Sequence, residues 1–571
     1  MVSYQPTMLG TRYMCSAGHY LASRAGFEIL EAGGNAVDAG VAAAMSLAVL
    51  QSDIVNVGGV APMIVYLAET DEVITISGLG YWPKAADIGK FIGPNGGAIP
   101  HGVMRSIVPA APGAWTTALA KYGTMSFAEV SEAPIRYARE GFSMHPTLND
   151  SITNTQDQLR RWPSNAEIYL PNDKVPDVGE NFVQSDLART LQYMADEEAA
   201  APGDREAALE AARKAFYEGD IAQAIVKYHI ENDGFMAAED LRDFRVGIES
   251  PVMRSYFGFD IYTCDAWCQG PVLLQIMSLL DGFDLKGMGH NSADYIHTVL
   301  ESIKLAFADR ERYYGDPKFI DVPLDHLLSD EYVAGRRAMI DPEQASPGMP
   351  PFGAVPGYDG GGGSGPSAAM HGAALIEYDT SYACAVDSQG NAFSVTPSDT
   401  SASSPIIPGT GIVCSGRGSQ SWAIPEHASS IAPGKRPRLT PNPAMAIKKG
   451  KVTMPFGTPG GDVQCQSMTQ VFLNINLFGM TAQEAIEAPR FGSYSHPDSF
   501  EPHLAQPGTV KIENRVSGDT VSELKSRGHA VEQWPELTRA AGAVCTIYHD
   551  RENGRMFGGA DPRRQSGMMG W

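Results

Sequence analysis

The hydrophobic pattern of this chain predicts long helices mixed with short strands. Residues 36–50 are apolar on nearly every face, which predicts a helix buried between layers with Asn35 as its N-cap. Residues 63–67 and 73–76 are rich in β-branched residues around a polar turn and predict two strands. Apolar residues spaced by three or four predict further helices over 126–139, 206–222 and 295–314. This mixture is typical of an α/β layered protein.

A segment rich in proline and glycine separates two parts of the chain. Residues 342–370 show little periodicity and include four consecutive glycines at 360–363. The segment formally matches a dinucleotide-binding fingerprint, but no predicted strand precedes it and no predicted helix follows, so a flexible linker is favoured. We therefore predict a first region over 1–341, a linker over 342–379 and a second region over 380–571.

The second region begins with a predicted β-hairpin led by a threonine. Residues 380–387 alternate as a strand, 388–391 have turn character and 392–396 return as a second strand. A turn centred on Gln389 would place Ser398 across from Thr380. The pattern therefore predicts that these two hydroxyl side chains are neighbours.

A cut between Asp379 and Thr380 would give this threonine unusual chemistry. The new first residue would carry a hydroxyl nucleophile and, on the same residue, a free α-amine as base. An α-amine titrates near ~8, so a useful fraction is neutral at physiological pH. The position of Thr380 directly after the linker suggests this cut.

Acyl transfer also needs donors for the oxyanion, and one turn offers them. Gly460 and Gly461 lie between a predicted strand over 452–456 and a predicted helix over 464–478. Adjacent glycines let backbone N–H groups approach a ligand, and the N-terminus of a helix favours negative charge. Each feature also has an ordinary structural explanation, since threonine favours strands and glycine pairs commonly form turns.

Composition and charge narrow the classes of partner. The net charge of −23 argues against nucleic acid or an anionic membrane surface. The seven cysteines are scattered, and Cys264 and Cys268 lack a second pair, so we expect no disulfide framework, no metal and no cofactor. The N-terminal residues show no basic segment followed by an apolar stretch, so a cytoplasmic location is expected.

Short motifs follow one another in order along nearly the whole chain. They are GNAVDA at 34–39, VPAAPG at 108–113, KYG at 121–123, KLAFADR at 304–310, GDP at 315–317, PGKRP at 433–437, GG at 460–461, APRF at 488–491 and DPR at 561–563. This series resembles the gamma-glutamyltransferase-like family of N-terminal-nucleophile hydrolases. The resemblance implies an α/β fold, an αββα sandwich with two stacked antiparallel sheets between helical layers, formed by one intertwined domain.

The resemblance also implies the catalytic residues. By position, the autocatalytic cleavage site falls on Asp379 and Thr380, with Thr380 as nucleophile and Ser398 as its hydrogen-bond partner. The oxyanion glycines fall on Gly460 and Gly461. The mature enzyme would be a heterodimer of the two cleaved chains, and pairing into a dimer of heterodimers stays open.

The residues that recognise glutamate in this family are not all reproduced. The arginine that holds the substrate carboxylate falls on Leu79, and a bidentate clamp is not replaced by leucine. We expect Arg417 or Arg438 to bind a substrate anion, with a solvated surface position as the alternative for both. The candidate substrate-binding residues, several carried over by position, are Thr400, Arg417, Gln420, Arg438 and Thr440.

The sequence therefore predicts a self-cleaving amidohydrolase that acts on a small-molecule amide through an acyl-enzyme, with non-glutamyl specificity. Three alternatives stay open. The chain could be a true γ-glutamyl hydrolase or transferase, it could use the same threonine for C–C cleavage in a biosynthetic pathway, or it could be a non-catalytic binding homologue.

Overall fold

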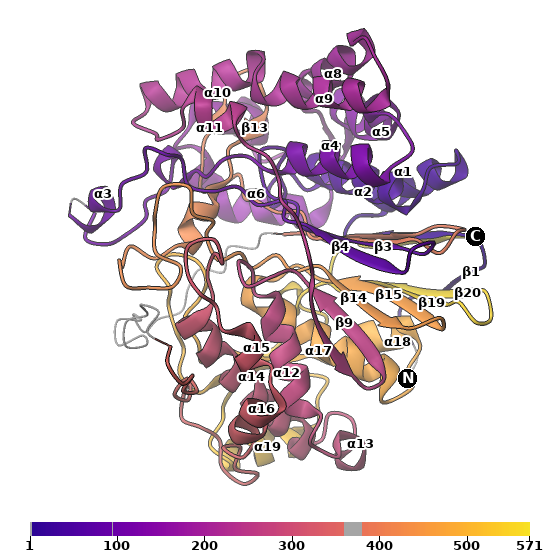
Figure 1. Cartoon of the computed structure of the whole chain (residues 1–571), viewed down its shortest axis with the longest axis vertical. Helices are drawn as coiled ribbons and strands as arrows, with labels where there is room; N and C mark the ends of the chain where they lie inside the picture. The colour runs from indigo at the N-terminus through magenta and orange to yellow at the C-terminus, as the bar shows by residue number, and fades with distance from the viewer. Residues whose placement is uncertain (1–2, 94, 359–379) are drawn as a thin grey trace.

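Two seven-stranded antiparallel sheets lie face to face between two layers of helices in a computed structural model of the protein (Figure 1). The structure describes residues 3–93, 95–358 and 380–571. Buried apolar side chains fill three spaces, one beneath each helical layer and one between the sheets. The predicted αββα sandwich is confirmed.

The first sheet carries the predicted nucleophile. Its strands, in spatial order, are β21 (Gly567–Gly570), β2 (Met14–Ala17), β10 (Ala383–Val386), β11 (Ala392–Val395), β3 (Met63–Leu67), β4 (Glu72–Ile76) and β7 (Ile248–Glu249). The second sheet has the order β1 (Met8–Gly10), β20 (Arg555–Ala560), β19 (Cys545–Asp550), β15 (Val452–Gly457), β14 (Ala444–Lys448), β9 (Phe259–Thr263) and β8 (Val252–Tyr256).

Helices cover the outer face of each sheet (Figure 1). The layer on the first sheet contains α1 (Tyr20–Glu31), α2 (Ala36–Leu50), α4 (Ala111–Tyr122), α5 (Phe127–Glu140), α6 (Pro146–Leu159), α8 (Ser185–Ala200), α9 (Arg205–Tyr217), α10 (Asp220–Glu231) and α11 (Ala238–Arg242). The layer on the second sheet contains α12 (Gly270–Leu280), α13 (Leu285–Met288), α14 (Ala293–Tyr313), α15 (Leu324–Leu327), α16 (Asp330–Arg337), α17 (Gln464–Asn476), α18 (Ala482–Glu487) and α19 (Gly518–Ser526).

Smaller elements complete the described chain. They are α3 (Gly89–Ile92), α7 (Pro163–Tyr169), the pairs β5 (Phe142–Ser143) with β6 (Asn181–Phe182) and β12 (Ile406–Ile407) with β13 (Ile412–Val413), and a third sheet of β16 (Phe491–Ser493), β17 (Thr509–Glu513) and β18 (Ala530–Trp534).

Helix α2 supports the first sheet from behind. All of its residues are buried, as the apolar pattern predicted, and it packs on β10 and β11. Its N-terminus is closed by a capping box, in which Asn35 accepts from the backbone of Asp38 and the Asp38 carboxylate accepts from the backbone of Asn35. The predicted N-cap is therefore confirmed.

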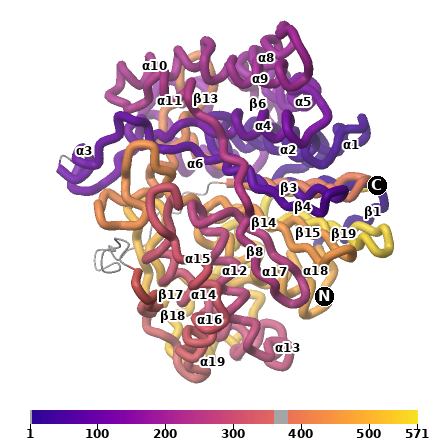
Figure 2. The backbone as a smooth tube through the Cα atoms, viewed as in Figure 1, coloured from indigo at the N-terminus to yellow at the C-terminus, as the bar shows by residue number. Residues whose placement is uncertain are grey.

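The two predicted regions interleave within the first sheet. Strand β10 lies between β2 and β11, and β11 pairs with β3, so the hairpin of the second region is inserted between strands of the first. The outer strands close the same side of the molecule, since β1 pairs with β20 and β21 with β2, and both termini lie there (Figure 2). The two chains produced by a cut ahead of β10 would therefore still contribute strands to the same sheet.

Two predicted boundaries were wrong. The helix expected over 206–222 divides into α9 and α10 at Gly219, where an added Cβ would meet the Ala215 carbonyl at 2.7 Å. The strand expected from residue 380 begins only at Ala383, because Thr380 has a positive φ of 86°, outside the strand region.

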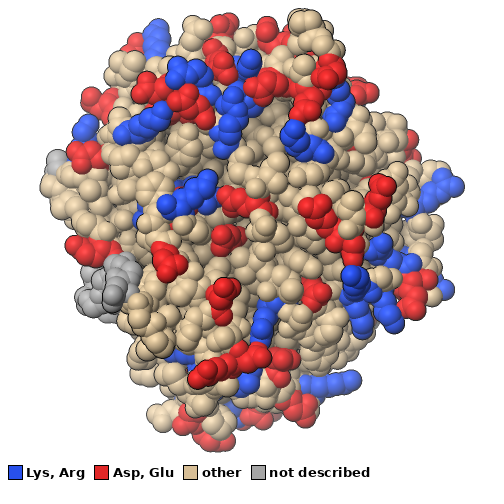
Figure 3. Space-filling model, in the orientation of Figure 1, with Lys and Arg blue, Asp and Glu red and all other residues tan. Residues whose placement is uncertain are grey.

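The face shown in Figure 3 carries acidic and basic side chains side by side, without a continuous basic area. Within the described ranges, no helix has both the length and the apolar character needed to cross a membrane.

Candidate active site

The predicted hairpin brings Thr380 and Ser398 together. In β10 and β11, Ala383 pairs with Val395, which is the predicted register and sets Ser398 opposite Thr380. Both side chains are fully buried, and their hydroxyl oxygens lie 2.6 Å apart in a hydrogen bond. Asp379 and the glycine run at 360–363 lie outside the described residues.

The backbone of Thr380 is held on both sides. Its N–H donates to the carbonyl of Ile54 at 2.9 Å, and its carbonyl accepts from the guanidinium of Arg564 at 2.8 Å. The φ of 86° places a β-branched residue in a region that such residues avoid, at a cost of about 1–3 kcal/mol. The uncleaved chain therefore stores strain at the residue that follows the predicted cleavage site.

Arg417 makes the next link in the site. It lies in the short 3₁₀ helix Gly416–Gln420, is 1% exposed, and donates to the hydroxyl oxygen of Ser398. Because arginine has donors only, Ser398 accepts this bond, and its own hydrogen can point toward Thr380. A cation is therefore linked to the Thr380 hydroxyl through one intervening hydroxyl group.

Asp399 positions this 3₁₀ helix. Its carboxylate accepts from the Ser415 hydroxyl at 2.5 Å and from the Gly416 amide at 2.9 Å, and it lies 3.8 Å from the Arg417 guanidinium. That last distance marks an ion pair rather than a hydrogen bond. Asp399 thus orients Arg417 and offsets part of its charge.

The predicted oxyanion turn has the backbone that its glycines allow. Gly460 and Gly461 have φ of 126° and 57° and lie just beyond the end of β15. Within the described chain, neither backbone N–H donates a hydrogen bond to a protein acceptor. Both glycines are partly exposed, so these donors are available to a ligand.

Buried charges hold this turn in place. The carboxylate of Asp462 pairs with Arg310 of α14 and accepts from the backbone and hydroxyl of Ser499 at 2.8 and 2.6 Å. Burial by itself raises the pKa of Asp462, but the Arg310 guanidinium outweighs it and keeps the pKa below its usual value. The carboxylate therefore stays ionised beside the two glycines.

Gln269 connects the turn with the rest of the site. Its amide nitrogen donates to the carbonyls of Gly461 and Thr440 at 2.8 and 2.9 Å, and its oxygen accepts from Arg310 at 3.2 Å. The Thr440 hydroxyl in turn lies 3.4 Å from Arg417. A continuous chain of polar contacts thus runs from Thr380 to the oxyanion turn.

The other predicted substrate-binding residues lie in different surroundings. Gln420 and Thr440 are buried and bond to each other at 2.9 Å. Thr400 is partly exposed, and its hydroxyl accepts from the Ala402 amide at 3.1 Å. Arg438 is 1% exposed and pairs with Glu311 at 2.8 Å, so it is not a solvated surface residue.

Several residues of the site were missed by the sequence interpretation. Gln269 and Phe500, whose ring centre lies 5.2 Å from the guanidinium carbon of Arg417, carry no recognisable local signal. Arg564 directly follows the Asp-Pro-Arg motif, which could have drawn attention to it. Asp53 precedes Ile54, which binds the backbone of Thr380. Burial raises the pKa of Asp53, although Arg564 and His145 oppose the shift.

One group of described residues has the side chains for a metal ion, namely His297, Glu301 and His529. Its donors are already used, because the two imidazoles bond to each other at 2.9 Å and Lys304 pairs with Glu301 at 2.6 Å. A divalent ion would have to compete with a buried ammonium, and we assign no metal there.

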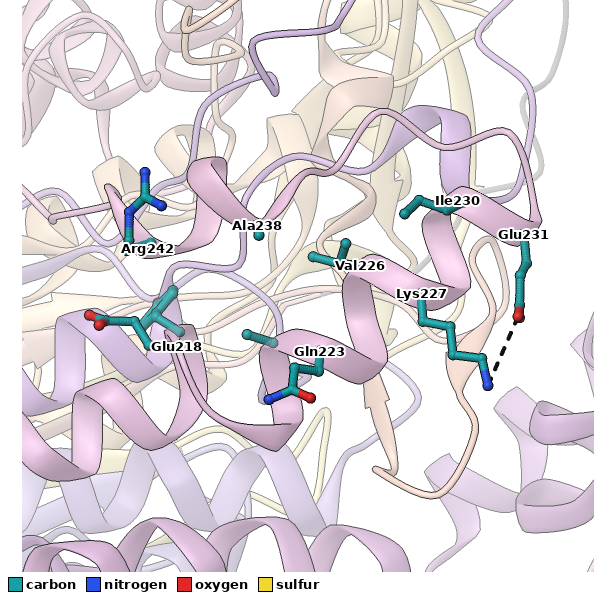
Figure 4. Close-up of a pocket in the computed structure, with 10 residues that line it drawn as sticks. Glu218, Gln223, Val226, Lys227, Ile230, Glu231, Ala238 and Arg242 are labelled. Atoms are coloured by element: carbon teal, nitrogen blue, oxygen red, sulfur yellow. Dashed lines mark ion pairs between the residues drawn. The ribbon is translucent and has the colours of Figure 1, made fainter.

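A surface cavity of about 620 Å³ lies among α9, α10 and α11 (Figure 4). Val226 and Ile230 line it, and Lys227 faces Glu231 across 4.0 Å at its edge. None of the predicted site residues lines this cavity.

Comparison with known proteins identifies the family. The Gamma-glutamyltranspeptidase family profile matches residues 22–571. The glutathione hydrolase-like YwrD proenzyme of Bacillus subtilis (strain 168) is 32% identical, with 99% of each chain covered. The acylase ACY 1 proenzyme of Pseudomonas sp. (strain SE83) is 31% identical, covering 94% of this chain and 90% of that one. A crystal structure of cephalosporin acylase from Bacillus halodurans superposes with a TM-score of 0.86 at 28% identity, covering 100% and 98%.

The chain belongs to the gamma-glutamyltranspeptidase family. It has the N-terminal-nucleophile hydrolase fold of that family and is a gamma-glutamyltransferase-like amidohydrolase. Its matched relatives are proenzymes, which implies a mature form of two cleaved chains.

The family motifs meet one another in the fold. Arg490 of the Ala-Pro-Arg-Phe motif pairs with Asp561 of the Asp-Pro-Arg motif at 2.6 Å. Arg436 of the Pro-Gly-Lys-Arg-Pro motif pairs with Asp316 of the Gly-Asp-Pro motif at 2.8 Å. Arg310 of the Lys-Leu-Ala-Phe-Ala-Asp-Arg motif holds the oxyanion turn. These motifs therefore join distant segments around the site.

Proposed function

We propose that this gamma-glutamyltranspeptidase-family enzyme cleaves itself before Thr380 and then uses Thr380 to hydrolyse a small-molecule amide. The observation that carries the proposal is the 2.6 Å hydrogen bond between Thr380 and Ser398, linked through Arg417 and Gln269 to the oxyanion turn.

In self-cleavage, the Thr380 hydroxyl oxygen attacks the carbonyl carbon of Asp379. The peptide nitrogen leaves as the α-amine of Thr380 and an ester forms, which water hydrolyses to release the Asp379 carboxylate. The positive φ of Thr380 supports this step, because breaking the peptide bond releases its strain.

In the mature enzyme, the α-amine of Thr380 accepts the proton of its own hydroxyl as the oxygen attacks the substrate amide. The N–H groups of Gly460 and Gly461 stabilise the oxyanion, the leaving amine takes a proton, and water hydrolyses the acyl-enzyme. Ser398 orients the nucleophile throughout.

Specificity should differ from that of glutamyl-specific relatives. Leu79 stands where their carboxylate-binding arginine would fall, and it is 2% exposed within a buried apolar cluster. Arg438 pairs with Glu311 away from the hairpin, whereas Arg417 bonds to Ser398, so we propose Arg417 as the residue nearest to a substrate anion. We propose minor roles for Thr400, Gln420 and Thr440 in lining the site.

A true γ-glutamyl hydrolase or transferase is the second candidate, favoured by the matched glutathione hydrolase-like relative. Turnover of a γ-glutamyl anilide at a rate comparable with other amides would support it.

The first experiment follows self-cleavage of purified protein by denaturing electrophoresis. We expect two fragments in place of the 61.2 kDa chain, and none from Thr380→Ala. Thr380→Ser is the matched control, because it keeps the hydroxyl and should still cleave. If the wild-type chain remained uncleaved, the proposal of self-cleavage would be wrong.

The two cleaved chains should stay associated, since β10 lies between β2 and β11 in one sheet. Copurification after cleavage tests this heterodimer, and light scattering tests a dimer of heterodimers. A cytoplasmic location stays a proposal that cell fractionation can test.

A further inference from the structure

A second buried arginine holds the backbone of Thr380. Arg564 lies in the turn between β20 and β21 and is 5% exposed, and its guanidinium donates to the Thr380 carbonyl at 2.8 Å. The nitrogen and the carbonyl oxygen of one residue lie no more than about 3.6 Å apart. The guanidinium nitrogen therefore lies within about 6.4 Å of the Thr380 nitrogen, which self-cleavage would turn into the α-amine.

The turn that carries Arg564 is fixed by contacts on both sides of this residue. The preceding Arg563 pairs with Glu513 at 2.8 Å, and the carbonyl of the following Gln565 accepts from the Tyr20 amide at 3.0 Å. The position of the Arg564 guanidinium is thus set by its neighbours in the chain as well as by its bond to the nucleophile.

Other charged and titratable groups face Thr380 from neighbouring elements. Arg417 is linked to it through one hydroxyl group, and Asp399 lies 3.8 Å from the Arg417 guanidinium. Asp53 lies in the turn after α2, whose next residue accepts the hydrogen bond of the Thr380 N–H. Two further sets are His145, which faces Asp53 and has the ring of His19 at 5.0 Å, and the ion pair of Asp462 with Arg310 beside the oxyanion turn.

Neither imidazole adds a positive charge at neutral pH. His145 donates through Nε2 to the Leu50 carbonyl at 2.9 Å, and its Nδ1 accepts from the Leu148 amide at 3.2 Å and so carries no proton. Burial lowers the pKa of His19 well below its usual value. The charges near Thr380 are therefore those of arginines and carboxylates.

Burial and the charge of Arg564 act on the α-amine in the same direction. A cation beside an amine disfavours the protonated form of that amine, and so does removal from water. Thr380 is fully buried, and Arg564 bonds to Thr380 itself. The Asp399 carboxylate, by contrast, binds the 3₁₀ helix of Arg417, and burial keeps the pKa of Asp53 above its usual value. The pKa of the α-amine in the cleaved enzyme should therefore lie below its ordinary value near ~8.

We propose that Arg564 is a positioning residue of this enzyme, which keeps the α-amine of the cleaved Thr380 uncharged at neutral pH so that the amine can accept the proton of its own hydroxyl. The inference rests on the proposed function, since it concerns the base that the cleaved enzyme would use. No bond to Arg564 is made or broken in the reaction. The proton passes from the hydroxyl oxygen to the amine nitrogen and then to the leaving amine.

The test is the pH dependence of kcat/KM for the cleaved enzyme, because its acid limb reports the base of the free enzyme. The substrate is whichever of acetyl, butyryl, phenylacetyl and glutaryl 4-nitroanilide the enzyme hydrolyses fastest, and none of these gains or loses a proton between about pH 6 and 9. We expect the acid limb of the wild type to have its midpoint at or below about pH 7, against ~8 for an unperturbed α-amine.

Three variants connect this midpoint with Arg564. Arg564→Gln removes the charge and should move the midpoint to higher pH by at least about 0.7 pH unit, whereas Arg564→Lys keeps the charge and should stay within about 0.3 pH unit of the wild type. Arg551→Gln is the matched control and should not move the midpoint. Arg551 bonds to Tyr66 at the far end of the hairpin, about 20 Å along the strand from Thr380.

A fourth variant identifies the group that titrates. Asp53→Asn should keep the acid limb, at the wild-type midpoint or at lower pH, because the amine titrates and the Asp53 carboxyl does not cause the limb. If the limb disappeared in Asp53→Asn, this carboxyl would be the titrating group and the inference would be wrong.

The outcomes separate this inference from the proposed function. A wild-type midpoint at pH 8 or above, or an unshifted midpoint in Arg564→Gln, would overturn the role of Arg564 and leave the proposed function intact. If Arg564→Gln did not cleave itself, the wild-type midpoint and the limb in Asp53→Asn would decide by themselves. If the cleaved wild-type enzyme hydrolysed no amide, the proposed function and this inference would fail together.

Discussion

Replacing Gln269 by leucine should loosen the oxyanion turn while leaving every predicted catalytic group in place. Gln269 is 1% exposed, and its side chain makes three hydrogen bonds, two as donor to backbone carbonyls and one as acceptor from Arg310. At about 1 kcal/mol net for each bond, the variant should lose about 3 kcal/mol of unfolding free energy.

The effect on catalysis follows from the turn. Removing one oxyanion donor commonly costs 10²–10³ in kcat, and here the donors stay but lose their orientation, so we expect a fall of roughly 10–100-fold. KM should change by less than about threefold, because Gln269 donates to backbone carbonyls and not to a side chain proposed to bind substrate. The assay is steady-state hydrolysis of a 4-nitroanilide that the wild-type enzyme turns over, alongside urea unfolding.

Gln483→Leu is the matched control. Gln483 is equally buried and makes three hydrogen bonds, to Glu487 and to both backbone groups of Ala560. It should lose a similar amount of stability and keep its kcat. If Gln269→Leu kept kcat within threefold of wild type despite the same loss of stability, the claim that Gln269 positions the oxyanion turn would be wrong.

Three further predictions concern other parts of the molecule. Gly460→Ala should lower kcat far more than Gly461→Ala, because a φ of 126° is closed to alanine while 57° lies in the left-handed region that other residues can enter; equal losses would contradict this. Burial lowers the pKa of His229 to about 4, so the stability from its neutral form is present above pH 6.5 and is lost as the pH falls toward 4. In His229→Leu, the fall in unfolding free energy between pH 7 and pH 4, measured with urea, should be smaller than in the wild type by up to about 3 kcal/mol. An unchanged dependence of stability on pH would refute the assignment. Arg490→Met removes one of the two arginines that pair with the buried Asp561, leaving Arg563, and should cost about 1.5–3 kcal/mol in thermal unfolding; the double variant with Asp561→Asn should recover part of it.

Much of the fold could be predicted because it depends on local patterns. The fully apolar run of α2 and its Asn35 cap, the strands β3 and β4, and the hairpin of β10 and β11 all follow from periodicity and turn residues. The hairpin register even predicted the pairing of Thr380 with Ser398. The predicted boundaries were wrong where one backbone angle ends a strand, as at Thr380, or one close contact ends a helix, as at Gly219.

The site was only partly predictable, since its parts come from distant segments. Gln269, Arg310 and Phe500 meet the hairpin only after both sheets and the helices of the second layer have packed. No short-range pattern marks Gln269 or Phe500, and Arg438 resembles Arg417 in the sequence and in burial until their partners distinguish them. Arg438 pairs with Glu311, and Arg417 reaches Ser398.

The sequence by itself determined the layered α/β class, the threonine-led hairpin and the family, because these depend on periodicity, turn chemistry and the order of motifs. Only the tertiary structure decided which polar groups surround Thr380, and which of two arginines lies beside it. The physical reason is that a buried charge takes its role from the partners that packing brings to it, and those partners lie up to hundreds of residues away along the chain.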